Sequence, residues 1–67
     1  MTSEQYRRAL KKVDLSIVGA GRFFGASARA GQRWAADGPP PTVVLCLRLM
    51  LALRMTAADV LSTIEKK

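Results

Sequence analysis

The stretch LSIVGAGRFFGASARAGQRW, residues 15–34, decides the fold because it contains two short helical patterns separated by a glycine. The first pattern predicts a helix over residues 17–24, and the second predicts an amphipathic helix over residues 28–36. Gly25 directly follows the first helix, where a residue with positive φ would end that helix and turn the chain sharply. The order therefore predicts two helices joined by a tight turn, which we call the helix pair.

Helical patterns also precede the helix pair. Thr2 and Gln5 form a capping box for a helix whose apolar side chains recur at helical spacing. In that helix the residues expected in the core are Tyr6, Ala9, Leu10 and Val13. In the helix pair the residues expected to face inward are Ala20, Gly21, Phe24, Gly31 and Trp34.

The segment after the helix pair predicts two more helices. Three prolines at 39–41 indicate a stiff connector, and Pro41 suits the first position of a helix over residues 42–54. Thr56 and Asp59 form a second capping signature. The last helix is expected to turn inward Ala57, Val60, Leu61 and Ile64. Because no stretch alternates like a strand, the fold class predicted for residues 1–67 is one small all-α domain of five helices.

The charge of the chain indicates its partner. The 67 residues include eleven Lys and Arg but only five Asp and Glu, a formal net charge of +6. Such a charge indicates an acidic partner such as nucleic acid, although a basic face can also be simply solvated. Seven of the eleven basic side chains lie in residues 1–37, so the excess lies mainly in the half that contains the helix pair.

The chain lacks the residues that an enzymatic function would need. With no histidine, one cysteine and five scattered carboxylates, the chain offers no acid–base pair and no nucleophile beside a base. The same counts exclude a disulfide framework and a zinc ligand set, and they fit a cytoplasmic protein. Cys46, among leucines, is expected to be buried as a small apolar side chain. We therefore expect a protein that is not an enzyme and binds no metal or cofactor.

The outer face of the helix over residues 28–36 carries side chains suited to double-stranded DNA. Two helices around a tight turn can place the second helix in the major groove. There, Arg29 can donate two hydrogen bonds to O6 and N7 of guanine, and Gln32 can pair with N6 and N7 of adenine. Arg33 is placed either for a second base or for the phosphate backbone. We predict that this helix reads base edges.

Further contacts to phosphates are expected around this helix. The hydroxyl groups of Ser16 and Ser27 are placed to donate to phosphate oxygens. Arg22 either contacts a phosphate or lies in bulk solvent. Lys11 belongs to a basic face of the first helix that either touches the DNA backbone or is only solvated. That face consists of Arg7, Arg8, Lys11 and Lys12.

At these residues the chain resembles the phage-repressor-like (Xre/Cro-type) helix-turn-helix regulators. The resemblance is carried by LS-x4-GRFFGAS-x-R-x-GQRWA-x-DG, and it extends over most of the chain, to about Val60. It implies a λ-repressor-like five-helix fold and homodimeric binding to an operator. The recognition residues that it implies are Ser27, Ala28, Arg29, Gln32 and Arg33. We expect a repressor, since 67 residues leave no room for an activation or ligand-sensing domain.

The sequence departs from this family pattern at three positions of the helix pair. Ile17 stands where the family commonly has a glutamine that contacts DNA. Gly21 and Gly31 stand where alanine and a β-branched residue are usual. Glycine in a helix interior costs about 1 kcal/mol relative to alanine. These glycines are expected either to loosen the helix pair or to let its two helices pack closer.

The helix over residues 42–54 is apolar on almost every side, so a domain of this size cannot cover all of it. We expect one face to complete the core and another to meet a second copy in a homodimer. The residues expected at that interface are Leu47, Met50, Leu51 and Arg54. No membrane span is expected, because the apolar run is far shorter than the about 20 residues that a span needs and Arg48 interrupts it.

Two other functions stay open. One is a protein-binding module of the same fold (an antiactivator, an antitoxin or an accessory subunit) that has lost DNA binding. Ile17 and the additional glycines favour it, and its partner would bind the apolar fourth helix or the basic face. The other is association with a membrane surface through the same helix and the nearby arginines.

Overall fold

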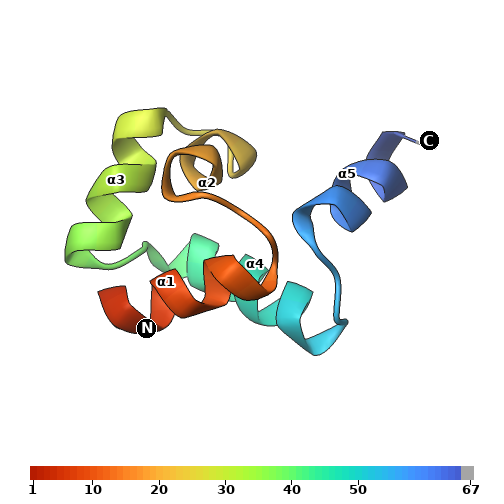
Figure 1. Cartoon of the computed structure of the whole chain (residues 1–67), viewed down its shortest axis with the longest axis horizontal. Helices are drawn as coiled ribbons and strands as arrows, with labels where there is room; N and C mark the ends of the chain where they lie inside the picture. Colours follow the sequence, from red (N-terminus) through yellow and green to blue (C-terminus); the bar gives the residue numbers. More distant parts are fainter. Residues whose placement is uncertain (66–67) are drawn as a thin grey trace.

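The described residues, 1–65, form five α-helices and no strand in a computed structural model. The helices are α1 (Ser3–Lys12), α2 (Ile17–Phe23), α3 (Ala28–Asp37), α4 (Pro41–Ala52) and α5 (Ala57–Glu65). The molecule measures 34 × 23 × 18 Å. Figure 1 shows α3 at one end of the long axis and α5 at the other, with α1, α2 and α4 between them. The predicted all-α domain of five helices is confirmed, with helix boundaries that differ by one or two residues.

The two predicted capping boxes are present. The N–H of Gln5 donates to the Thr2 hydroxyl oxygen at 3.1 Å, and the N–H of Thr2 donates back to the Gln5 side chain at 2.9 Å. At the start of α5, Thr56 and Asp59 make the same exchange at 2.9 and 3.3 Å. These short-range bonds satisfy N–H groups that a helix start leaves without a partner, so the sequence alone sets where both helices begin.

The ends of α1 and α4 share one geometry. Asp14 (φ 61°) and Arg54 (φ 54°) adopt the left-handed conformation directly after these helices. The N–H of the following residue then donates to the carbonyl five residues back, at 2.9 Å in both cases. This pattern satisfies a carbonyl that the helix end leaves free and reverses the chain. Arg54, expected at a dimer interface, is therefore the turn residue between α4 and α5, and its side chain is exposed.

The core lies where α1 packs against α3 and α4, with α2 beside α3 and above α1 and α4 in Figure 1. The largest side chains that are fully buried are Tyr6, Leu10, Val13 and Leu47. All four core residues predicted for α1 are buried, and so is Ala20 of α2. Phe24 and Trp34 are half-buried and pack against this cluster. The core therefore holds α3 to the body through its inner side.

The predicted dimer interface on α4 is wrong at its centre. Leu47 and Met50 are 0% and 6% exposed, so they belong to the core of the protomer, and Leu51 is half-buried against it. Cys46, expected to be buried, is exposed instead. Because α4 is apolar around its circumference, its sequence does not indicate which side faces the body. The exposed leucines of α4 and the turn after it are Leu45, Leu49 and Leu53.

Helix α5 contacts the body mainly through its first turn. Ala57 is buried, and its N–H donates to the carbonyl of Val13 at 2.8 Å. Val60 is half-buried against the core. Leu61 and Ile64, predicted to face inward, are 47% and 61% exposed. That part of the prediction is wrong, because the protomer places no further element over the outer half of α5.

Candidate nucleic-acid interface

The turn between α2 and α3 occupies residues 24–27 and bends at Gly25, where φ is +81°. L-residues with a side chain rarely adopt this conformation, so the predicted role of Gly25 is confirmed. The turn is fixed at its next residue, because the N–H of Ala26 donates to the carbonyl of Gly21 at 2.7 Å. Ser27 then caps α3, and its hydroxyl oxygen accepts the N–H of Ala30 at 3.1 Å.

Backbone packs against backbone where α2 crosses α3. A Cβ atom built on Gly21 would lie 2.7 Å from the amide nitrogen of Gly31, and closer still to the carbonyl oxygen of Ser27. One built on Gly31 would lie 2.9 Å from the nitrogen of Gly21 and would overlap the carbonyl oxygen of Ile17. Of the two outcomes left open for these glycines, closer packing is the one found. The helix pair is consequently a tight unit.

Aromatic side chains from the end of α2 and from α3 pack against one another. The rings of Phe23 and Phe24 meet edge to face, with centroids 5.0 Å apart and an interplanar angle of 86°. Phe24 in turn contacts Trp34 of α3, at 6.3 Å and 60°. Edge-to-face contacts of this kind add about 0.5–1.5 kcal/mol beyond the area that they bury. Trp34 therefore fixes the rotation of α3 about its own axis.

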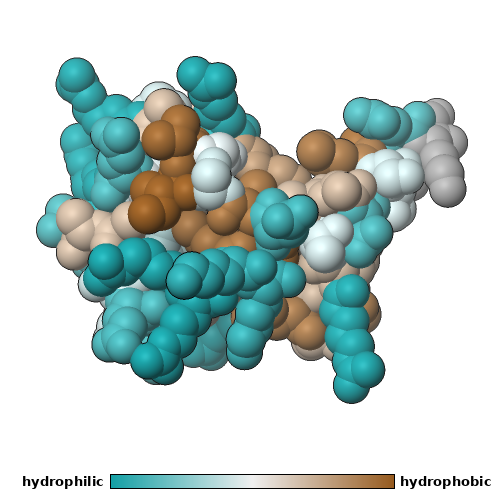
Figure 2. Space-filling view, viewed as in Figure 1, coloured by the Kyte–Doolittle hydropathy of each residue, from teal (hydrophilic) through white to brown (hydrophobic). Residues whose placement is uncertain are grey.

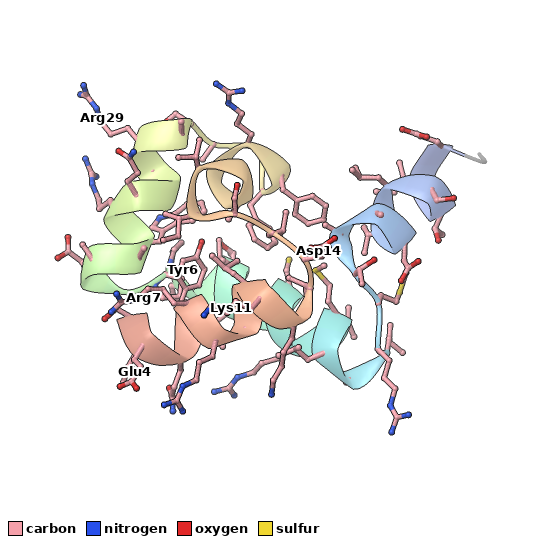
Figure 3. The ribbon with its side chains drawn as sticks, viewed as in Figure 1. Glu4, Tyr6, Arg7, Lys11, Asp14 and Arg29 are labelled. Atoms are coloured by element: carbon pink, nitrogen blue, oxygen red, sulfur yellow. The ribbon has the colours of Figure 1, made fainter. Side chains whose placement is uncertain are left out.

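That rotation turns the predicted base-reading side chains outward. Gly31 and Ala35 are buried on the inner side of α3, whereas Arg29, Gln32 and Arg33 are exposed on the outer side. Figure 3 shows Arg29 projecting from the first turn of α3, away from the body of the molecule. All three side chains are thus on one accessible face of a single helix, and the major groove of DNA is wide enough to admit one helix.

The electrostatics of this face favour an anion. Residues 15–36 contain three arginines, Arg22, Arg29 and Arg33, and no acidic residue. Within the part of the chain that the structure describes, the one ion pair joins Arg8 to Glu4 on α1, at 2.8 Å. The three guanidinium groups are therefore not neutralised by a carboxylate of residues 1–65. The amide end of α3 adds a partial positive charge beside them.

The two cap serines keep a free donor. The hydroxyl oxygen of Ser16 accepts the N–H of Gly19 at 2.8 Å, just as that of Ser27 accepts an N–H in α3. Both serines are exposed. Since the oxygen acts as acceptor in each cap, the hydroxyl proton remains available to a phosphate oxygen. The geometry is compatible with the phosphate contacts predicted for Ser16 and Ser27.

The remaining predicted contacts are less closely grouped. Ala28 is half-buried in the first turn of α3, and Arg22 is exposed near the end of α2. Lys11 is exposed on α1, a different element, so it does not belong to the base-reading face (Figure 3). On α1, Arg8 is already paired with Glu4, whereas no ion pair within residues 1–65 engages Lys11.

Sequence reasoning missed an exposed apolar pair at the start of α2. Ile17 and Val18 are 39% and 40% exposed. The carbonyl of Ile17 lies directly against Gly31, so this pair borders the middle of α3. Ile17 shares the helical spacing of the inward residues Ala20 and Gly21, so periodicity alone does not signal its exposure. An apolar contact here can involve a thymine methyl group as well as a protein side chain.

Comparison of the chain with family models, with curated proteins and with solved structures gave no match. None of the helices in residues 1–65 has the length and apolar character that crossing a membrane requires. The same residues contain no group of three His, Cys, Asp or Glu side chains that could hold a metal ion.

Proposed function

We propose that this protein is a sequence-specific DNA-binding transcriptional regulator of the Xre/Cro type, a repressor that reads the major groove with α3. The observation that carries the proposal is the exposure of Arg29, Gln32 and Arg33 on one face of a helix whose other face is locked against α2. A rigid helix fixes the backbone positions from which these side chains reach a ligand, so their hydrogen bonds to a base can be placed accurately. Such a regulator acts in the cytoplasm of a bacterium or of a phage-infected cell.

The roles within this interface follow from the chemistry of each side chain. Arg29 pairs with guanine and Gln32 with adenine, and each bidentate pair discriminates against a wrong base by about 1–3 kcal/mol. Arg33 takes a second base or a phosphate. The hydroxyls of Ser16 and Ser27 hold phosphates on either side of the helix. As a homodimer, the protein would place two α3 helices in successive major grooves, about 34–36 Å apart, on a palindromic site.

A titration of the full chain tests the proposal. Duplexes that the protein retains are selected from a random pool, and ¹⁵N-labelled protein is titrated with a selected duplex and with its scrambled counterpart. We expect the largest shifts at residues 27–33, and tighter binding of the selected duplex. Equal affinity for both duplexes would remove the claim of base reading, and no binding to either duplex at moderate salt would remove DNA as the partner.

A second candidate function is a protein-binding module that has lost DNA binding, and the exposed pair Ile17 and Val18 favours it. In this function the pair and the nearby arginines would form one docking surface for another protein. The Ile17→Gln variant separates the two functions. It should preserve or strengthen duplex binding if α2 meets DNA, and it should weaken capture of a protein partner if the apolar pair is the contact.

A further inference from the structure

An open apolar groove of about 600 Å³ lies between α5 and the rest of the molecule. The side chains that form its walls come from the end of α2, from α4 and the turn after it, and from α5. The largest of them are Phe23, Phe24, Leu49, Leu53, Leu61 and Ile64. The last four are between 47% and 61% exposed. Figure 2 shows hydrophilic side chains over α1 and α3, and a hollow beside α5 that hydrophobic atoms border.

The groove does not have the chemistry of a small-molecule site. Such sites orient a ligand with a few convergent polar groups. Among the described residues, Thr63 is the one side chain of this lining that bears a hydroxyl group, and that hydroxyl already donates to the carbonyl of Asp59 at 2.9 Å. No other side chain that lines the groove within residues 1–65 can fix the orientation of a ligand through a strong hydrogen bond. An apolar surface of a macromolecule fits better.

The side of α5 that faces the groove is not covered by the other helices of residues 1–65. This helix has nine residues, and isolated helices shorter than about 12 residues are marginal in water. Its contacts with the body are concentrated at Ala57 and Val60, whereas Leu61 and Ile64 open toward the groove. A partner that covers these two side chains would stabilise the helix and fill the groove together.

The lack of charge in the groove suits a second copy of this chain. The protein carries a formal net charge of +6, yet no charged side chain of residues 1–65 lines the groove. An acidic protein would be met by a surface with cations, because interacting surfaces have complementary potentials. A second copy of this chain carries the same positive charge, so it can approach closely only where that charge is absent. The groove is such a place.

We propose that the groove is the self-association surface of this protein and that its occupant is α5 of a second copy. In a two-fold dimer both protomers use the same patch, so the patch must be complementary to itself. The groove can meet this condition, because its lining includes Leu61 and Ile64, the exposed apolar side chains of α5 that the second copy would contribute. This exchange replaces the interface that the sequence predicted around Leu47 and Met50.

The position of the groove is compatible with the proposed function, on which this inference rests for its biological role. Figure 1 places α5 at the opposite end of the long axis from α3. A two-fold axis through the groove therefore leaves both α3 helices at the outer ends of the dimer. If that axis points toward the DNA, both base-reading faces lie on the same side.

Two matched variants test the proposal. Ile64→Lys places a charge in the groove at a residue that is 61% exposed, and lysine near a helix C-terminus does not disfavour the helix. Leu45→Lys adds the same charge at a leucine of α4 that is 69% exposed and lies outside the groove lining. Sedimentation equilibrium of the full chain should give a dimer for the wild type and for Leu45→Lys. Ile64→Lys should raise the dissociation constant about tenfold or more.

Cys46 provides a native probe in the same experiment, because it is exposed and lines the groove. Its thiol should react more slowly with a maleimide as the concentration of wild-type protein rises, and at a constant rate in Ile64→Lys. A wild-type chain that remains monomeric overturns the proposal, and a dimer that only Leu45→Lys disrupts does so too. If a selected duplex shifts residues 27–33 of a monomeric chain, the inference fails while the proposed function stands. If the chain dimerises through the groove but binds no duplex, the inference stands while the proposed function fails.

Discussion

Gly21 and Gly31 meet backbone to backbone, and their hydrogen-only side chains allow α2 and α3 to approach more closely than any other residue pair would permit. A Cβ atom on Gly21 would stand 2.7 Å from the nitrogen of Gly31, a separation that real Cβ atoms do not adopt. The obstacle on both sides is backbone, which cannot rotate away. The exposed face of α3 that carries Arg29, Gln32 and Arg33 is therefore positioned by two residues that lie outside that face.

The variant Gly31→Ala should destabilise the fold. Alanine improves helix propensity by about 1 kcal/mol, but overpacking against backbone costs about 1–3 kcal/mol and occasionally more. We expect a net loss of up to about 2 kcal/mol in the free energy of unfolding, measured by urea denaturation. Gly25→Ala tests a different effect. No atom lies within 4 Å of a Cβ built on Gly25, so only the positive φ of this residue opposes alanine there. If Gly31→Ala were stabilising, the close approach of α2 and α3 would not exist in solution.

Arg29→Ala should relax the base preference at one position of the bound site. The lost bidentate contact is expected to remove about 1–3 kcal/mol of discrimination at that position and to leave the other positions unchanged. Affinities for a set of duplexes that vary one base pair at a time provide the measurement. Arg48→Ala, which removes an equal charge from α4, should leave the whole profile unaltered. A uniform loss at every position would reassign Arg29 to the phosphate backbone.

Lys11→Ala should weaken binding evenly across sequences. Lys11 lies on α1 outside the base-reading face, so its expected contact is a phosphate. Loss of one phosphate contact lowers the slope of log affinity against log salt by about 1. Titrations at several salt concentrations, with selected and scrambled duplexes, give that slope. An unchanged slope would mean that the α1 face is only solvated.

The local features of this fold could be predicted from the sequence because each is fixed by nearby residues. The capping box at Thr2 and the turn at Gly25 need only their neighbours, and both are found as expected. The apolar stripe of α1 identified its buried side because the remaining positions are charged or polar. The exposure of Arg29 and Arg33 follows from the same reasoning, as α3 has one side of small and aromatic residues.

The surface of α4 and α5 could not be predicted in this way. An all-apolar helix offers no periodic signal, so Leu47 and Leu49 look alike in sequence although one is 0% and the other 59% exposed. Only the packing of α1 decides between them. No other element of residues 1–65 covers Ile64, so its exposure likewise does not follow from the periodicity of α5. The sequence indicated more apolar surface than a domain of this size covers, and in the structure much of the exposed part lines the groove.

Tyr6→Phe should stabilise the protein. The Tyr6 side chain is fully buried, and its hydroxyl has no hydrogen-bond partner among the described residues. An unsatisfied buried group costs about 1–3 kcal/mol, so removing it should raise the free energy of unfolding by about 1 kcal/mol. In a domain of this size that corresponds to a midpoint about 4–8 °C higher in thermal denaturation. A lower midpoint would show that the hydroxyl is satisfied in solution.

Tyr6→Phe should also change how the free energy of unfolding depends on pH in alkaline solution. Burial raises the pKa of the Tyr6 phenol above its ordinary value of 10.0. The unfolded chain therefore releases this proton at a lower pH than the folded chain does. Ionisation of this group therefore leaves the free energy of unfolding unchanged below about pH 10 and lowers it as the pH rises further, because the folded protein disfavours the phenolate. Denaturation at increasing pH should show a smaller loss for Tyr6→Phe than for the wild type.

The capping box of α5 predicts an acid-sensitive helix. Hydrogen bonds from Thr56, first from its backbone N–H and then from its side chain, lower the pKa of the Asp59 carboxyl below its ordinary value of 3.8. A lowered pKa means that the ionised form stabilises the folded helix. This contribution is present above the ordinary pKa and is lost as the pH falls through the lowered value. The Cα chemical shifts of α5 should accordingly move toward coil values in strong acid, before those of α1.

Asp59→Asn isolates this effect, because asparagine still accepts the N–H of Thr56 but carries no proton to titrate. Its shifts in the first turn of α5 should stay constant over the same pH range. Since α5 forms one wall of the groove, acid should also weaken self-association in the wild type and leave it unchanged in Asp59→Asn. If the Asp59 carboxyl titrated at or above its ordinary pKa, the hydrogen bonds of the capping box would not stabilise the charged form. A shared acid response of both proteins would instead assign the weakening to other carboxylates.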